Sequence, residues 1–252
     1  MELLLFFLLG LGVGTFGTLV GIGGGLILIP IFLLVLHFPA QQAIGTSLTV
    51  VFFNALSGTI AYIKQKKVYY DAAFRFALAT LPGAFLGSYL ADYFTGTTFN
   101  MVFGVFLLFM AILMYTKSSS KKAEADFDKE TFTYNRMLGI IISAGVGFLS
   151  SILGIGGGVI HVPLMIYALG FPTHVATATS HCVLAVSSFT GVISHYILNH
   201  ILVGPALSIG IGAVIGAQIG AKLSNKTKSK VIIILLSCAV FALGVRLIIS
   251  AL

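Results

Sequence analysis

Clustered glycines are the residues of this chain whose type and spacing most clearly suggest binding chemistry. The string GIGGG occurs at residues 21–25 and again at 154–158, each time inside a long apolar run. Glycine costs about 1 kcal/mol in a helix interior relative to alanine, so each string should break a helix. The half-helix that follows would begin with free backbone amides, which can hold an anion without a buried lysine. We therefore predict an anion site at Gly23, Gly24, Gly25, Gly156, Gly157 and Gly158.

Close helix packing is the alternative explanation for these glycines. Pairs such as Gly10 with Gly14, or Gly212 with Gly216, have the small-xxx-small spacing that lets two membrane helices approach closely. For such isolated pairs we favour packing. Three consecutive glycines exceed what packing needs, so for the two strings we favour binding.

Two Thr-Ser pairs add hydroxyl groups to the predicted site. Thr46-Ser47 and Thr179-Ser180 follow the two glycine strings at the same distance, shortly after a Phe-Pro pair. Their hydroxyls could donate to an anion held on the facing glycine turn. They could equally bond to carbonyls of their own helix or cap it, as Ser and Thr commonly do. Both interpretations stay open, and all four residues belong to the predicted binding site.

Two histidines are candidates for carrying a proton through the membrane. His161 and His181 lie within apolar segments, where the first half of the chain has Leu28 and Leu48. Imidazole changes its charge near neutral pH, so either ring could couple transport to protons. The alternative is a neutral histidine that is hydrogen-bonded within the bundle. Together with Cys182 they match no known spacing of metal ligands, so we expect neither a metal site nor a cofactor.

The composition is that of a membrane protein. The chain has 252 residues, of which 58% are hydrophobic and 8% are charged. Soluble domains are about a quarter charged, so the composition indicates an integral protein of the lipid bilayer. The net charge of +7 comes from Lys and Arg in short breaks between apolar runs, as in loops that face the cytoplasm. This pattern argues against nucleic-acid binding.

The two halves of the chain repeat one another. Residues 10–63 align with residues 143–196 without a gap, and 19 of the 54 aligned positions are identical. We expect a first membrane repeat over residues 1–116, a cytoplasmic linker over 117–136 and a second membrane repeat over 137–252. Apolar segments are predicted at residues 3–36 (divided by the glycine string), 43–63, 72–91, 99–115, 176–197, 201–221 and 231–249.

Positive charge predicts how the repeats cross the membrane. The basic loops are residues 64–67, 117–122 and 222–230, and basic loops generally stay in the cytoplasm. If all three loops lie in the cytoplasm, each half has five passes or half-passes. Because this number is odd, the second half enters the membrane from the opposite side and is inverted relative to the first. The predicted fold is an all-α integral membrane protein with two inverted repeats, each with a broken or re-entrant helical hairpin plus three membrane-spanning helices. Both termini are predicted to lie outside.

These motifs resemble the sulfite exporter TauE/SafE family of membrane transporters. The most specific features are the duplicated GIGGG with a proline five residues later, at Pro30 and Pro163, and the duplicated Ala-x-x-Thr-Ser that begins at Ala43 and Ala176. The resemblance covers essentially the whole chain. It implies a transporter of small anions, such as sulfite or sulfoacetate, in a prokaryotic cytoplasmic (inner) membrane.

The predicted function is secondary transport, and in particular export, of a small sulfur oxyanion or organosulfonate by alternating access, without enzymatic activity. A passive anion channel and a transporter of a small carboxylate are the alternatives. An intramembrane enzyme would need a paired nucleophile and base, such as Ser180 with His181, yet adjacent residues lie on different faces of a helix. Glycine-rich helix faces would also allow a homodimer.

Overall fold

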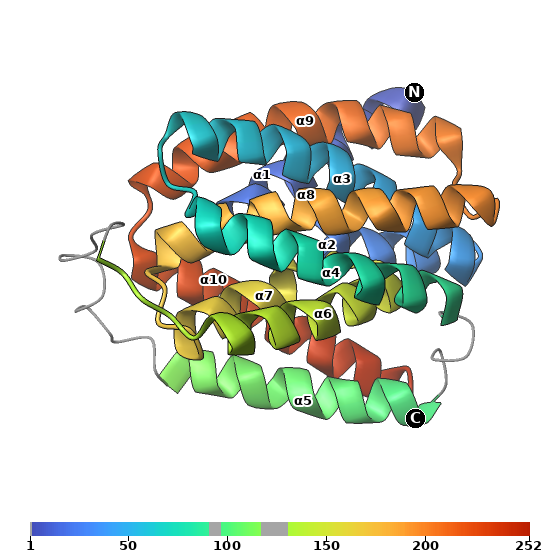
Figure 1. The fold of residues 1–252 in the computed structure, drawn as a ribbon. Coiled ribbons are helices and arrows are strands. Elements are labelled where there is room, and N and C mark those ends of the chain that lie inside the picture. The colour runs from blue at the N-terminus through green and yellow to red at the C-terminus, as the bar shows by residue number, and fades with distance from the viewer. Residues whose placement is uncertain (1, 91–96, 117–130) are drawn as a thin grey trace.

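The described part of the chain folds into helices. A computed structural model describes residues 2–90, 97–116 and 131–252, and these residues contain no β-strand (Figure 1). Residues 117–130, most of the predicted linker, lie outside the described residues. The helices are α1 (Glu2–Val20), α2 (Gly25–Pro30), the π-helix η1 (Ile31–Val35), α3 (Ala40–Lys64), α4 (Tyr70–Leu90), α5 (Thr97–Thr116), α6 (Arg136–Leu153), α7 (Gly158–Tyr167), α8 (Thr173–Ile197), α9 (Val203–Lys226) and α10 (Ser229–Ile249).

Length and hydropathy qualify several of these helices to cross a bilayer. Within the described ranges six helices are long and apolar enough by these criteria, namely α1, α3, α6, α8, α9 and α10. The predicted all-α membrane class is therefore confirmed. How far each hairpin crosses the membrane, and whether the second repeat is inverted, stay predictions.

The glycine strings interrupt the helices as predicted. Helix α1 ends at Val20 before α2 begins, and α6 ends at Leu153 before α7 begins. Gly23 and Gly156, which are equivalent in the repeat, have φ angles of 76° and 70°. Such left-handed backbone is strained for residues with a Cβ atom, so the break depends on glycine at these positions.

One predicted helix end was wrong. The segment predicted to end at residue 221 continues as α9 to Lys226. The prediction stopped at the first lysine, but Lys222 is exposed while Ser224 is buried, so the helix has both a solvated and a packed face here. Lysine does not end a helix when its charged end reaches solvent.

The helices pair across the two halves of the chain. Helix α1 packs against α9, and its repeat counterpart α6 packs against α4. Helices α3 and α8 also contact each other, as do α5 and α10. In Figure 1, α9 lies at one side of the bundle and α5 at the other, with the short helices α2 and α7 between longer helices. Each half therefore completes the packing of the other, which brings the two glycine strings to the middle.

Glycine makes the close crossing of α6 and α4 possible, which gives a testable prediction. A Cβ atom on Gly147 would overlap the Thr80 carbonyl group, whereas a Cβ atom on Gly145 would meet nothing within 4 Å. We expect Gly147→Ala to destabilise the protein by about 1–3 kcal/mol through this overlap. Gly145→Ala, two residues away on the same helix, should leave the stability unchanged or raise it slightly. Thermal unfolding of the purified variants in detergent, followed by circular dichroism, measures the difference, and equal midpoints would contradict this packing.

Candidate functional site

The two glycine turns touch each other in the interior of the protein. A Cβ atom on Gly25 would lie 2.6 Å from the carbonyl oxygen of Ile155, and one on Gly158 would overlap the carbonyl oxygen of Gly21. Both turns are buried. The contact is therefore backbone against backbone, and it brings together the starts of two short helices from opposite halves of the chain.

Free amide groups lie at both helix starts. The amides of Gly25 and Leu26, and those of Gly158 and Val159, make no hydrogen bond to another described residue. The first amides of any helix lack an intrahelical acceptor and carry partial positive charge. Buried amides in this state need an acceptor, and an anion can supply one.

Apolar side chains close the space between the turns. Cβ atoms on Gly23 and Gly156 would each meet the side chains of Val51 and Leu184, which are themselves equivalent in the repeat. Both side chains are buried and pack with Ala55 and Ala185. In this conformation a solute has no room directly between the two turns.

A narrow cavity lies beside the second turn. It holds about 160 Å³ of unfilled space and is too tight for a water molecule. Its polar lining comes from α4, α7 and α8. The lining residues are Thr80, Val146, Gly157, Gly158, His161, Ser180, Val183, Leu184 and Ser187.

The two threonines of the Thr-Ser pairs bind backbone amides of the opposite half. Thr46 Oγ1 accepts a hydrogen bond of 3.0 Å from the amide of Leu202, the residue before α9. Thr179 Oγ1 accepts one of 3.0 Å from the amide of Tyr69, the residue before α4. Each threonine thus anchors the start of a helix in the other repeat.

The two serines of these pairs differ from each other. Ser47 Oγ donates to the carbonyl oxygen of Gly154 at 2.8 Å, so it binds the facing glycine string. Ser180 Oγ has no hydrogen-bond partner, although the residue is only 1% exposed. An unpaired buried hydroxyl costs about 1–3 kcal/mol, so Ser180 is held in the cavity at the expense of stability.

Both predicted histidines are buried, each next to a hydroxyl. His161 Nε2 lies 3.1 Å from Ser143 Oγ, and the ring packs edge-on against Phe76. His181 Nε2 lies 3.2 Å from Thr18 Oγ1, and its ring packs against Tyr62. The structure places His161 at the cavity beside Ser180 and leaves His181 away from it.

The hypothetical pairings of these histidines do not occur. Ser180 faces the cavity while His181 contacts α1 and α3 at Thr18 and Tyr62, so the two do not form a nucleophile–base pair. Cys182 packs in a separate apolar cluster. Across residues 2–90, 97–116 and 131–252, no three His, Cys, Asp or Glu side chains gather closely enough to hold a metal ion.

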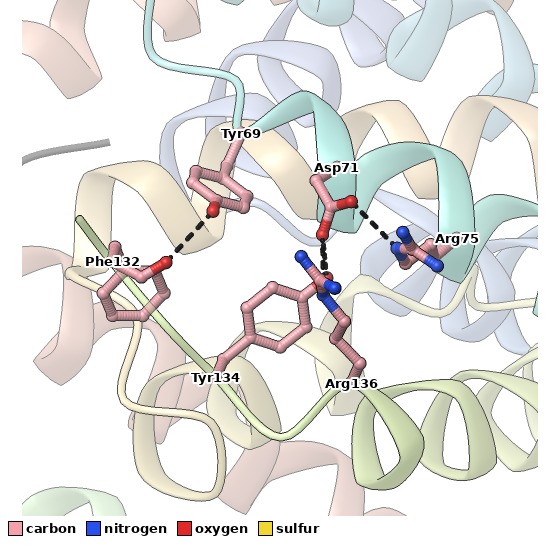
Figure 2. A network of polar contacts seen from close by, with 6 residues as sticks. All are labelled: Tyr69, Asp71, Arg75, Phe132, Tyr134 and Arg136. Atoms are coloured by element: carbon pink, nitrogen blue, oxygen red, sulfur yellow. Dashed lines mark hydrogen bonds and ion pairs between the residues drawn. The ribbon is translucent and has the colours of Figure 1, made fainter. Parts of the chain in front are cut away.

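A polar cluster that the sequence analysis missed lies at the start of α4 (Figure 2). Asp71 accepts hydrogen bonds from Arg75 Nε at 2.9 Å and from the Tyr134 hydroxyl at 2.8 Å, and Arg136 Nε lies 3.4 Å from the same carboxylate. Burial and the hydrogen bond to Asp71 raise the pKa of the Tyr134 hydroxyl. The spacing of Asp71 and Arg75, four residues apart on a helix, was the available sequence signal.

One connection from this cluster to the candidate site runs through Tyr69. Tyr69 donates its hydroxyl to the carbonyl oxygen of Phe132 at 3.2 Å, as Figure 2 shows, while its backbone amide donates to Thr179. Thr179 precedes the unpaired Ser180. The segment before α6 is thereby linked, through the start of α4, to the helix that lines the cavity.

The chain is similar to proteins described as membrane transporters. The family model "Sulfite exporter TauE/SafE" matches residues 6–247. A Bacillus subtilis (strain 168) protein, "Probable membrane transporter protein YunE", is 34% identical in an alignment 267 residues long that covers 98% of each chain. "Probable membrane transporter protein MJ0441" of Methanocaldococcus jannaschii is 31% identical over 202 residues, 77% of this chain and 73% of that protein. No solved structure matches the chain.

Ser47 and Ser180 occupy equivalent positions in the two halves, so substitutions of the two serines can be compared directly. Ser47→Ala removes the donor to the buried Gly154 carbonyl, and we expect a loss of about 1 kcal/mol or more in unfolding free energy. Ser180→Ala removes no hydrogen bond, so the stability should stay equal or rise. Denaturant unfolding in detergent measures both changes. A similar loss in the two variants would show that Ser180 does have a partner in the folded protein.

Proposed function

The chain belongs to the sulfite exporter TauE/SafE family, and we propose that it is a secondary transporter that exports a small anion. The substrate class is a sulfur oxyanion or an organosulfonate, such as sulfite or sulfoacetate. The family description names sulfite, and both curated relatives described above are named as membrane transporters. Neither name specifies an enzymatic activity.

One observation carries the proposal: a buried hydroxyl without a partner lies in a cavity at the start of a membrane helix. Ser180 can donate a hydrogen bond, and the amide of Gly158, which lines the same cavity, can donate another. None of the described residues that line this cavity is Lys or Arg. A cluster of neutral donors favours an anion while avoiding the desolvation of a buried base.

The proposed mechanism is alternating access between two inverted repeats. The anion would lie on the glycine turns, with contributions from both strings and from the Thr-Ser pairs. The side chains of Val51 and Leu184 keep the path closed in this conformation, so they have to separate for the anion to pass. We place the protein in the prokaryotic cytoplasmic membrane with both termini outside, as the basic loops favour.

Protons are the proposed coupling ions. His161 and His181 are both buried in membrane helices, and each has one ring nitrogen without a partner. A ring with a free nitrogen can take up a proton without breaking an existing contact.

A passive channel, the alternative, would neither accumulate the anion against its gradient nor respond to a proton gradient. A small carboxylate is the alternative substrate, and a homodimer is compatible with the exposed apolar helix faces.

The proposal predicts that Ser180→Ala impairs transport without impairing folding. Loss of one hydrogen bond to a charged group corresponds to about a tenfold to hundredfold loss of anion affinity. Uptake of radiolabelled sulfite into proteoliposomes, with and without an imposed proton gradient, measures the effect. Ser208→Ala is the matched control, because Ser208 is only partly buried and donates within its own helix to Gly204. Wild-type transport by the Ser180 variant would refute a role for this hydroxyl.

The glycine turns give a second prediction. Gly157 has a φ of −67°, which valine tolerates, and a Cβ atom there would lie 2.7 Å from Val146 Cγ1, the end of a side chain that can shift. We expect Gly157→Val to abolish sulfite transport by covering the helix start, while Gly145→Val on the open face of α6 transports normally. Gly24→Val should also abolish transport, with a larger loss of stability because Gly24 has a φ of 87°. Proteoliposome rates and unfolding midpoints separate these effects, and normal rates in the Gly157 variant would defeat the proposal.

A further inference from the structure

We infer that the proton-binding part of the anion site is one-sided and that His161 Nδ1 shares a proton with the bound anion, so that one anion and one proton occupy the site together. This inference rests on the proposed anion transport and adds the protonation state of the cargo. It assigns the shared proton to His161 rather than to His181. The evidence is the hydrogen-bond arrangement around the two histidines and their positions relative to the cavity.

The contacts of Ser143 fix which nitrogen of His161 carries hydrogen. Ser143 Oγ lies 2.7 Å from the carbonyl oxygen of Gly139, which can only accept, and 3.1 Å from His161 Nε2. The single hydroxyl proton satisfies both contacts only if it goes to Gly139. Nε2 must then donate to Ser143, so Nδ1 is a bare acceptor in the neutral ring.

Nδ1 of His161 is an acceptor without a donor. It is buried and has no hydrogen-bond partner, and His161 lines the same cavity as the unpaired Ser180. The other free groups there, the Ser180 hydroxyl and the amide of Gly158, are donors. An oxyanion bound to these donors would place an oxygen lone pair toward the lone pair of Nδ1, which is repulsive unless a proton lies between them.

The shared proton can be brought by the anion or taken up from water by His161 Nδ1. The same atoms make the contact in both cases. An anion with an acidic hydroxyl, such as the singly protonated form of sulfite, brings the proton and donates it to Nδ1. A permanently ionised sulfonate brings none, so Nδ1 takes a proton from water and the imidazolium pairs with the sulfonate. On release the proton leaves with the anion or returns to water. In both cases no covalent bond to the anion forms.

The first half of the chain offers no equivalent site. Leu28 stands at the position equivalent to His161, and Ser47, the counterpart of Ser180, already donates to Gly154. The free amides of Gly25 and Leu26 can still donate to an anion there, but the side chain of Leu28 cannot bind a proton and the Ser47 hydroxyl is already engaged. The repeat therefore supplies two similar turns, of which only the second has the groups for an anion with a proton.

His181 has the same hydrogen-bond state as His161 but lies elsewhere. Asn54 donates from Nδ2 to the carbonyl of Gly14, so its Oδ1 accepts the Thr18 hydroxyl proton, and His181 Nε2 must donate to Thr18. Its Nδ1 is also buried without a partner. Because His181 does not line the cavity, it is the matched control for any effect of an unpaired histidine nitrogen.

Among the contacts that the described residues make with His161, none involves a competing titratable group. The neighbours of His161 are Phe76 of α4 and Ser143 of α6, and across the cavity lie Thr80 of α4 with Ser180 and Ser187 of α8. None of these changes charge near neutral pH. Behind Phe76 lie Tyr134 and then Asp71, which are paired with each other. A pH-dependent change in anion binding at this cavity therefore reports on His161.

Calorimetric titration of the purified full chain with methanesulfonate tests the inference, because the charge of this probe does not change with pH. Between about pH 5 and pH 8 we expect the dissociation constant to rise with pH by up to about tenfold per unit. His161→Gln, whose amide can still reach Ser143, should bind more weakly and lose this pH dependence. His181→Gln should keep it. Titration of the wild type in buffers of different ionisation enthalpy should show uptake of about one proton per anion at the upper end of this range.

The outcomes separate the inference from the proposed function. If the wild type binds neither methanesulfonate nor sulfite at any pH, the proposed anion site itself fails. If it binds methanesulfonate with constant affinity and without proton uptake, the shared proton is refuted and the anion site stands. Retention of the wild-type pH dependence by His161→Gln, or its loss in His181→Gln, would also overturn the assignment. The proton-uptake measurement needs no variant, so it decides the question even if His161→Gln fails to fold.

Discussion

Direct backbone contact between two glycine turns is the constraint on which the rest of this structure depends. Gly25 and Gly158 lie against carbonyl groups of the opposite turn, at distances that exclude a Cβ atom. The contact fixes the positions of α2 and α7, and it leaves their first amides without acceptors inside the membrane protein. Such amides are unfavourable in a closed apolar interior, so the arrangement makes physical sense if a solute with acceptor oxygens occupies the site at some stage.

Reciprocal hydrogen bonds connect this centre to the ends of neighbouring helices. Thr46 holds the start of α9 and Thr179 holds the start of α4, so each half of the chain secures a helix of the other. The Asp71 cluster of Figure 2 adds the segment before α6 to the second of these connections. Because Thr179 is next to Ser180, a displacement of α4 would change the cavity wall. The two threonines thus have a defined structural role, in addition to any contact with the substrate.

Sequence reasoning predicted the features that are local or repeated. The breaks at residues 21–24 and 154–157 follow from glycine itself, and the ungapped repeat predicts that α6 to α8 copy α1 to α3. The hydroxyl partners could not be predicted, because Thr46 and Thr179 bond to residues 156 and 110 positions away. The repeat also concealed a difference, since identical residues at equivalent positions, Ser47 and Ser180, have different surroundings in the folded chain.

Asymmetry between the repeats bears on how such a site can both bind and release an anion. A buried lysine or arginine would hold the anion strongly and would itself be costly to desolvate. Neutral donors avoid this, but the bound anion then remains a charge in a region of low dielectric constant. A proton taken up by His161 would neutralise an enclosed sulfonate, which would lower the free energy of the occupied state. A sulfonate that crosses with this proton would carry no net charge, so a membrane potential, which contributes about 2.3 kcal/mol per elementary charge per 100 mV, would neither assist nor oppose it. Singly protonated sulfite, which brings its own proton, would keep one negative charge and would respond to the potential.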